Sequence, residues 1–160
     1  MKHSLRVTTP SEREIVMTRE FDAPRSLIYK AFTRPELVQQ WLLGPPGWTM
    51  PVCEIDLRVG GSYRYVWRSD KDGTEFGTQG EYREIVAPER IVCTERMDGF
   101  PNQSLNTLTL VETAGRTSVT QIMLVDSQEV RDAILKTGME KGVEVSYQRL
   151  ENVLARTAQR

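Results

Sequence analysis

The segment from Gly44 to Trp67 constrains the fold of this chain most, because it predicts a β-hairpin with one aromatic face. A loop rich in proline and glycine is followed by a strand in which polar and apolar side chains alternate. Gly60 and Gly61 then predict a turn, and a second strand carries an aromatic residue at every other position. The side chains that share this aromatic face are Tyr63, Tyr65 and Trp67. We therefore expect a half-buried sheet face that forms the wall of either a core or a cavity.

The bulk composition predicts one globular domain with no strong preference for a charged partner. A chain of 160 residues buries roughly two thirds of its unfolded surface on folding, so it needs no metal or disulfide to stabilise a core. Its 21 basic and 22 acidic side chains give a net charge of −1. This balance argues against a nucleic-acid footprint and against electrostatic docking on an anionic membrane. We predict neither nucleic acid nor membrane as a partner.

Cysteine use and the N-terminal residues predict a cytoplasmic protein. Cys53 and Cys93 lie inside apolar strand patterns and not in a CxxC motif, so we expect buried free thiols in a reducing compartment. The first residues, MKHSLRVTTPSE, contain no apolar core of signal-peptide length. No apolar run approaches the ~20 residues that a membrane-spanning helix needs.

The apolar periodicity along the chain predicts the order strand, two short helices, six strands and one long helix. Outside the hairpin, the predicted strands are 13–21, 75–86, 90–97, 104–112 and 116–125, and the predicted helices are 24–33, 35–43 and 128–156. An antiparallel sheet of about seven strands that curls around the last helix buries the apolar stripe of that helix most economically. The predicted fold class is α+β, with a single domain at 13–156 between flexible tails at 1–12 and 157–160.

Several short motifs in this order resemble a known family. The pieces that carry the resemblance are Phe21-Asp22-Ala23-Pro24, Pro35-Glu36-Leu37, Trp41, Gly44-Pro45, Asp56-Leu57-Arg58-Val59-Gly60-Gly61, Gly80 and Pro88-Glu89-Arg90-Ile91. Together they are similar to the C-terminal domain of the activators of the 90-kDa heat-shock-protein ATPase, in its large bacterial branch. That branch belongs to the START-like (SRPBCC) helix-grip superfamily, and the resemblance covers residues 13–156.

The resemblance implies a helix-grip fold, in which a curved antiparallel sheet holds the C-terminal helix and a cavity lies between them. The superfamily includes lipid carriers, plant hormone receptors, polyketide cyclases and aromatases, and chaperone cofactors. Because these members differ in activity, the resemblance specifies the fold better than it specifies an activity.

The usual residues of acid–base, metal and nucleotide chemistry are missing from the body of the predicted fold. The single histidine, His3, lies in the predicted tail, so neither a Ser/His/Asp nor a Cys/His arrangement is available there. One histidine and two separated cysteines do not make a zinc site, and no glycine-rich phosphate-binding motif is present. We predict no catalytic residue set, no metal and no cofactor.

Glu95 is the polar residue with the strongest case for a functional role. It shares a strand face with Ile91 and Cys93, so we expect it to point inward, where loss of water raises the pKa of a carboxyl and permits acid or base chemistry. The alternative is that the strand bulges and Glu95 reaches solvent. Glu81 and Gln121 are weaker cases of the same kind.

Two glycines in the predicted long helix indicate that something approaches it closely. Glycine costs a helix interior up to ~1 kcal/mol relative to alanine, yet Gly138 and Gly142 stand one turn apart. They leave room either for a ligand or for packing of the sheet or a loop. Trp41 and Trp48 flank the GPPG loop as a lid or as a closure of the core. The complete set of pocket candidates is Trp41, Trp48, Tyr63, Tyr65, Trp67, Glu81, Cys93, Glu95, Gln121, Met123, Gly138, Met139 and Gly142.

Three functions fit these observations. The first is a binding module for an apolar or aromatic small molecule, which an aromatic-walled cavity with a few polar groups favours. The second is interaction with a chaperone partner, taken from the family resemblance alone. The third is an enzyme of the cyclase, aromatase or hydrolase kind that uses Glu95, Glu81, Tyr63 and Tyr65. A monomer and a homodimer are both consistent with the sequence.

Overall fold

The computed structural model describes residues 3–158 and has one sheet of eight strands with four helices. The strands are β1 (Arg6–Thr8), β2 (Glu14–Phe21), β3 (Trp48–Ile55), β4 (Ser62–Ser69), β5 (Glu75–Val86), β6 (Arg90–Met97), β7 (Gln103–Thr113) and β8 (Arg116–Leu124). The helices are α1 (Arg25–Thr33), α2 (Pro35–Trp41), α3 (Gln128–Lys136) and α4 (Met139–Ala158).

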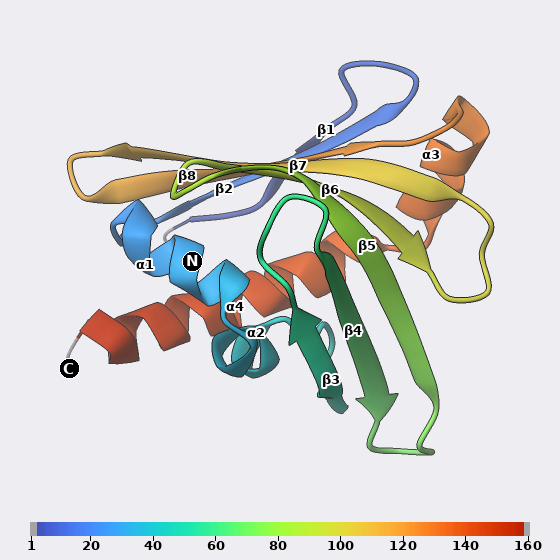
Figure 1. Cartoon of the computed structure of the whole chain (residues 1–160), viewed down its shortest axis with the longest axis horizontal. Coiled ribbons are helices and arrows are strands. Elements are labelled where there is room, and N and C mark those ends of the chain that lie inside the picture. The colour runs from blue at the N-terminus through green and yellow to red at the C-terminus, as the bar shows by residue number, and fades with distance from the viewer. Residues whose placement is uncertain (1–2, 159–160) are drawn as a thin grey trace.

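The sheet is antiparallel throughout and curves around the C-terminal helix. Its strand order is β1-β2-β8-β7-β6-β5-β4-β3, so β2 joins the last strand of the chain and the hairpin of β3 and β4 lies at the far edge. Figure 1 shows α1, α2 and α4 on the same side of the sheet, while β3, β4 and β5 bend down beside α2 and α4. The predicted α+β helix-grip fold is confirmed.

The strand β1 is an element that the sequence pattern did not predict. It pairs with β2 through Arg6 opposite Thr18, Val7 opposite Met17 and Thr8 opposite Val16, inside the segment expected to be a loose tail. Because β1 has three residues, it is too short to show the alternation that identifies a strand. The sheet therefore has eight strands and not seven. At the other end, α4 continues to Ala158, and residues 1–2 and 159–160 of the predicted tails lie outside the described residues.

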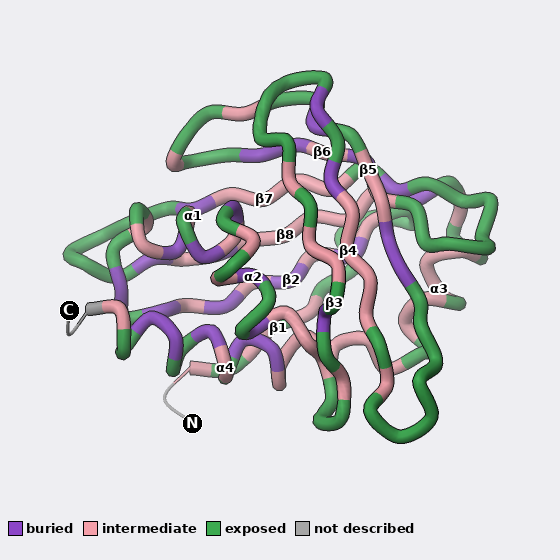
Figure 2. The backbone as a smooth tube through the Cα atoms, turned by 60° about the horizontal axis from the view of Figure 1, so that its bottom comes forward, coloured by how far each residue is buried: buried purple, intermediate pink, exposed green. Residues whose placement is uncertain are grey.

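The core is a cluster of aromatic rings around Tyr147 of α4. The ring centroid of Tyr147 lies 5.4 Å from that of Phe21 on β2, 5.9 Å from that of Trp41 on α2 and 6.5 Å from that of Phe32 on α1. Gln121 on β8 donates a hydrogen bond to the Tyr147 hydroxyl at 2.8 Å. Figure 2 shows the buried stretches of α4 facing the sheet at this level. One side chain thus connects the last helix to two strands and two helices.

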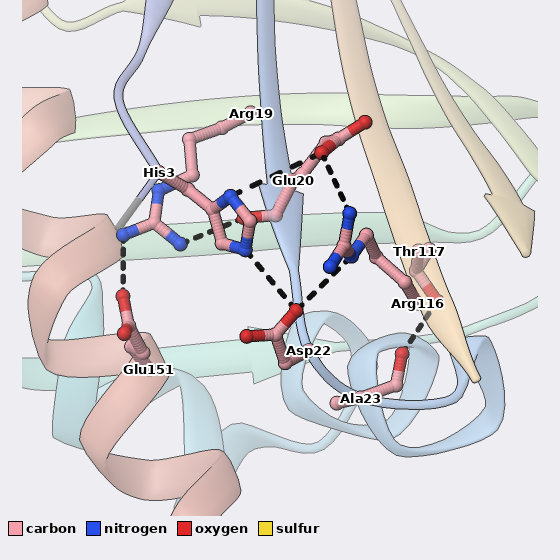
Figure 3. Close-up of polar contacts among 8 residues, drawn as sticks. All are labelled: His3, Arg19, Glu20, Asp22, Ala23, Arg116, Thr117 and Glu151. Carbon is pink, nitrogen blue, oxygen red and sulfur yellow. Dashed lines mark hydrogen bonds and ion pairs between the residues drawn. The ribbon is translucent and has the colours of Figure 1, made fainter. Parts of the chain in front are cut away.

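The N-terminal segment is held to the body of the fold by charged side chains. His3 Nε2 lies 3.1 Å from an oxygen of Asp22, and Arg116 Nε donates to the same oxygen at 3.1 Å (Figure 3). The buried Arg19 side chain pairs with Glu151 of α4 (Figure 3) and lies over the Phe21 ring. The structure places part of the segment expected to be a loose tail against β2, through the contact of His3 with Asp22 and the pairing of β1.

The predicted long C-terminal helix is two helices that meet at Gly138. Ser127 caps α3 by accepting a hydrogen bond from the amide of Val130 at 3.2 Å. Gly138 has a φ of +74°, a left-handed conformation that glycine adopts readily and that ends a helix. The prediction of one helix over 128–156 is wrong at this residue, since the glycine serves as a helix terminator.

Gly80 on β5 permits the closest approach in the sheet. A Cβ atom added to Gly80 would lie 1.8 Å from the carbonyl oxygen of Thr94 and 2.6 Å from the Tyr63 ring. The Tyr63 hydroxyl instead donates a hydrogen bond to that same carbonyl at 2.8 Å. The missing side chain therefore lets Tyr63 cross over β5 and reach β6.

Gly80→Ala should reduce the free energy of unfolding by about 1–3 kcal/mol, the usual cost of overpacking a core. The nearest atom to the added methyl group is backbone, which cannot move aside as a side chain can. Urea denaturation of the purified variant measures the change.

The matched control is Gly142→Ala in α4, where the nearest atom to an added Cβ is Pro45 Cδ at 3.7 Å. That substitution should stabilise the protein by roughly 0.5–1 kcal/mol, because alanine loses less conformational entropy in a helix. Equal effects of the two substitutions would contradict the close approach at Gly80.

Candidate functional site

A cavity of about 230 Å³ lies between the inner face of the sheet and the N-terminal part of α4. Its walls come from β2, β4 to β8, the two short helices and α4. The structure brings together nine of the pocket candidates from the sequence, and these are Trp41, Tyr63, Tyr65, Trp67, Cys93, Glu95, Gln121, Met123 and Met139. The alternating faces of the strands place them, because every second residue points to the same side.

The sequence reasoning missed eight lining residues. They are Met17, Phe32, Leu42, Tyr82, Ile91, Asn106, Leu108 and Val143. Strand parity would have found several of them: Ile91 follows from Cys93, and Asn106 and Leu108 lie opposite Cys93 and Ile91 across the ladder of β6 and β7. The fold decides which strands pair, so Asn106 and Leu108 could be identified only once the sheet topology was known.

Glu81 and Trp48 do not line the cavity. Glu81 is exposed on the outer face of the sheet, where its carboxylate lies 3.5 Å from the guanidinium of Arg83. It pairs with Ser62, one position away from the inward-facing pair of Tyr63 and Gly80. Trp48 is the first residue of β3 and is not among the residues that line the cavity. The hypothesis that Glu81 is a pocket carboxylate is therefore wrong on geometry.

The two helix glycines also lie outside the cavity. Gly138 terminates α3, and an added Cβ there would meet open space. Gly142 faces the loop before β3, with its nearest neighbours in Pro45 and Gly44. Ser146 Oγ accepts a hydrogen bond from the Gly44 amide at 2.9 Å, on the same face of α4. Loop packing, and not ligand space, explains Gly142.

The aromatic residues form one continuous row along β4 and its neighbours. Successive ring centroids lie 5.1 to 5.9 Å apart, the spacing of interacting aromatic pairs. The order of rings is Tyr82, Tyr63, Tyr65, Trp67, Phe76 and Trp48. The first four line the cavity, while Phe76 on β5 and Trp48 on β3 extend the row beyond it. Three residues of the predicted aromatic face of the hairpin, Tyr63, Tyr65 and Trp67, line this space.

Glu95 lies in the cavity wall and is surrounded by protein. It keeps some accessible surface because it faces the cavity, and burial raises the pKa of its carboxyl, while a hydrogen bond from Asn106 opposes that rise. Glu95 forms no ion pair with any residue in the described part of the chain. The inward orientation predicted for it is confirmed, and the carboxyl has no cation to balance its charge.

The phenols and the thiol beside Glu95 do not ionise near neutral pH. Burial raises the pKa of Cys93 to about 12, and the charge of Glu95 adds to this rise. The pKa values of Tyr63, Tyr65 and Tyr82 are also raised, chiefly by burial. Glu95 is therefore the acidic group of this wall, with a pKa that burial raises above the ordinary value of a glutamate.

Most N–H and O–H groups around the cavity donate to the protein itself. Trp41 Nε1 donates to the Ala31 carbonyl at 2.9 Å, and Trp67 Nε1 donates to the Leu42 carbonyl at 2.7 Å. The hydroxyl of Tyr63 and the amide nitrogen of Gln121 are also used, as described above. The Glu95 carboxyl is the acidic acceptor of the wall, and the hydroxyls of Tyr65 and Tyr82 also line the cavity.

Metal binding and nucleophilic catalysis gain no support from the arrangement. Within residues 3–158, no group of three or more His, Cys, Asp or Glu side chains is placed to hold a metal ion. His3 contacts the carboxylates of Asp22 and Glu20 near the end of β2 and does not line the cavity. What the site can do is enclose a small molecule and offer it one carboxyl group.

No helix among the described residues is long and apolar enough to cross a membrane. A sheet curved around a C-terminal helix, with an enclosed space between the two, defines the helix-grip class of the START-like superfamily. The sequence profile described as "Activator of Hsp90 ATPase homolog 1-like protein" matches residues 22–155. The chain belongs to this family, and the predicted resemblance is confirmed.

Solved structures of several bacterial proteins have the same fold. A protein from Rhodobacter sphaeroides is 27% identical, with a TM-score of 0.91 over 96% of this chain and 99% of its own. A protein from Chromobacterium violaceum is 28% identical, with a TM-score of 0.79 over 90% and 98%. An AHSA1-like protein from Aeromonas hydrophila, at 19% identity and a TM-score of 0.68 over 86% and 93%, shares the fold alone. No curated protein sequence matches the chain.

Glu95→Gln should make protein stability less sensitive to pH. Because the folded-state pKa of Glu95 is raised, its protonated form favours folding, and this contribution is lost as pH rises through the folded-state pKa. The variant should therefore gain stability relative to wild type between pH 4 and pH 8, by roughly 1–3 kcal/mol for an uncompensated buried polar group. Thermal unfolding at a series of pH values measures the difference.

The control is Glu81→Gln, which changes the same chemical group on the exposed face. Substitution of an exposed side chain should change the free energy of unfolding by less than about 0.5 kcal/mol. A difference between Glu95→Gln and wild type that does not vary with pH would show that Glu95 is solvated in the folded protein.

Proposed function

We propose that this protein binds an apolar or aromatic small molecule in the cavity between the sheet and α4, without a dedicated catalytic machine. The observation that carries the proposal is the cavity of about 230 Å³ with aromatic walls and few polar groups. Small-molecule sites commonly have this composition, in which apolar walls supply affinity and a few polar groups fix orientation.

The contrast between the two halves of the interior supports a real space and not a loosely packed core. Around Tyr147, the inward side chains are almost completely covered, with Leu110 1% and Val119 0% exposed. On the same sheet face at the cavity, Leu108 and Met123 remain half-buried. A protein that fills one half of its interior to full density and leaves space in the other half fits a binding role.

The other functions remain predictions. Interaction with a chaperone partner is a candidate function because of the family to which the chain belongs. Catalysis in the cavity is another candidate because Glu95 lies in its wall. Location in the cytoplasm and assembly as a monomer or homodimer are likewise predictions, as is the lack of nucleic-acid and membrane partners.

Native mass spectrometry of freshly purified protein, beside a denatured control, is the direct test. Under this proposal an added mass accompanies the folded chain and leaves on denaturation. The complementary assay uses the uncharged probe N-phenyl-1-naphthylamine, whose fluorescence should increase on entering the cavity. Absence of both the added mass and the fluorescence increase would overturn the proposal.

Cys93→Phe should reduce the affinity for N-phenyl-1-naphthylamine by about tenfold or more, because the added ring occupies the cavity that the probe needs. Cys93 lines the cavity. Probe titration followed by fluorescence gives the affinity.

Thr107→Phe is the matched control, since Thr107 pairs with Val92 on the outer face of the same strands. This variant should bind the probe as wild type does. Unchanged binding by a folded Cys93→Phe protein would place the probe elsewhere.

A further inference from the structure

The cavity places a carboxylate without a cationic partner next to aromatic rings. Cys93 and Glu95 follow each other on the inner face of β6, and Cys93 lies opposite Tyr82 and Asn106 in the ladder. Glu95, Tyr63 and Tyr65 line the same cavity, and the charge of Glu95 contributes to the raised pKa values of both tyrosines. A buried carboxylate is costly unless a cation or several hydrogen bonds balance it.

The described residues supply only part of that balance. The Asn106 side chain donates to Glu95, while its own oxygen accepts a hydrogen bond from Ser104 Oγ at 2.9 Å. The buried cation Arg19 is paired with Glu151 and lies over Phe21, and it does not line the cavity. The positive charge that would complete the site is thus absent from the chain around it.

Two other polar side chains of the wall also bear on the choice of ligand. Gln121 uses its amide nitrogen to hydrogen-bond Tyr147, and its side chain lines the cavity. The Tyr63 hydroxyl hydrogen is used on the Thr94 carbonyl, which leaves its oxygen able to accept. A ligand that brings N–H donors can satisfy both the Glu95 carboxylate and the Tyr63 oxygen.

We propose that the cavity selects a molecule with a protonated amine on an apolar or aromatic body, and that Glu95 is the carboxylate that pairs with the ammonium group. This rests on the proposed function, because it names the class of ligand for the same cavity. The ammonium group would lie against Glu95 and near the faces of Tyr63 and Tyr65, where ring electrons attract a cation. The apolar body would extend toward Trp67 and Met139.

The pH dependence of binding follows from the groups that face Glu95. The titratable neighbours are Tyr63 and Tyr65 from β4, Tyr82 from β5 and Cys93 from β6, all of which stay neutral near pH 7 because burial raises their pKa values. From β7 the facing group is the uncharged Asn106, and α4 contributes Met139 and Val143. Amine affinity should therefore rise with pH as Glu95 ionises, until the amine itself loses its proton.

The test compares three probes of similar shape, 2-phenylethylamine, 2-phenylethanol and phenylacetate, by isothermal titration calorimetry with the full chain at pH 8. The amine should bind about tenfold or more tightly than the alcohol, the advantage of a charge-assisted hydrogen bond, and phenylacetate should bind most weakly. Glu95→Gln should remove the advantage of the amine and leave the affinity for the alcohol unchanged. Glu81→Gln, the control, should change neither affinity.

The wild-type protein gives a second readout that needs no variant. Between pH 5 and pH 8, affinity for the amine should increase, while affinity for the alcohol should stay constant. If the alcohol binds as tightly as the amine, the ligand class is wrong and the binding function stands. If neither compound binds although N-phenyl-1-naphthylamine does, the amine preference is also overturned. If the amine, the alcohol and N-phenyl-1-naphthylamine all fail to bind and native mass spectrometry shows no added mass, the binding function fails as well.

Discussion

The docking of α4 through Tyr147 is the interaction on which the rest of the structure depends. Phe21, Phe32 and Trp41 surround this ring, so β2, α1, α2 and the C-terminal helix are fixed relative to one another by one aromatic cluster. Such rings bury a large area and pack in preferred geometries. Once α4 is fixed at this level, its N-terminal part is held over the sheet at a distance that the side chains there do not fill.

The cavity therefore results from two constraints acting at different places. One is the anchored half of α4, and the other is the curvature of the sheet, where Gly80 allows Tyr63 to reach across to the Thr94 carbonyl. Between these fixed points, the inner faces of β4 to β8 present rings, thioethers and one carboxyl to an enclosed space. The space thus follows from how the sheet and the helix are held in the folded chain.

Much of this architecture could be predicted from the sequence, and the failures have identifiable physical causes. Alternation along β4 and β6 placed Tyr63, Tyr65, Cys93 and Glu95 on the inner face, because strand geometry is local. The assignment of Glu81 to the cavity was wrong because the sequence did not show that its neighbours Gly80 and Tyr82 face inward. The assignment of Gly142 was wrong because a small residue indicates that something lies close without showing what it is, and in the folded chain a loop lies there. Strand β1 was too short to leave a pattern at all.

The break at Gly138 divides the C-terminal segment into two helices of unequal stability. Helix α4 is held by Tyr147 and by the hydrogen bonds of Ser146 and Arg149 to Gly44, whereas α3 has no buried residue. A helix without buried contacts opens locally at little free-energy cost, while the helix beyond the break stays folded. Backbone amides of α3 should accordingly exchange their hydrogens with solvent sooner than those of α4. Since Met139, the first residue of α4, borders the cavity, a helix that opens more readily than α4 lies next along the chain to the cavity wall.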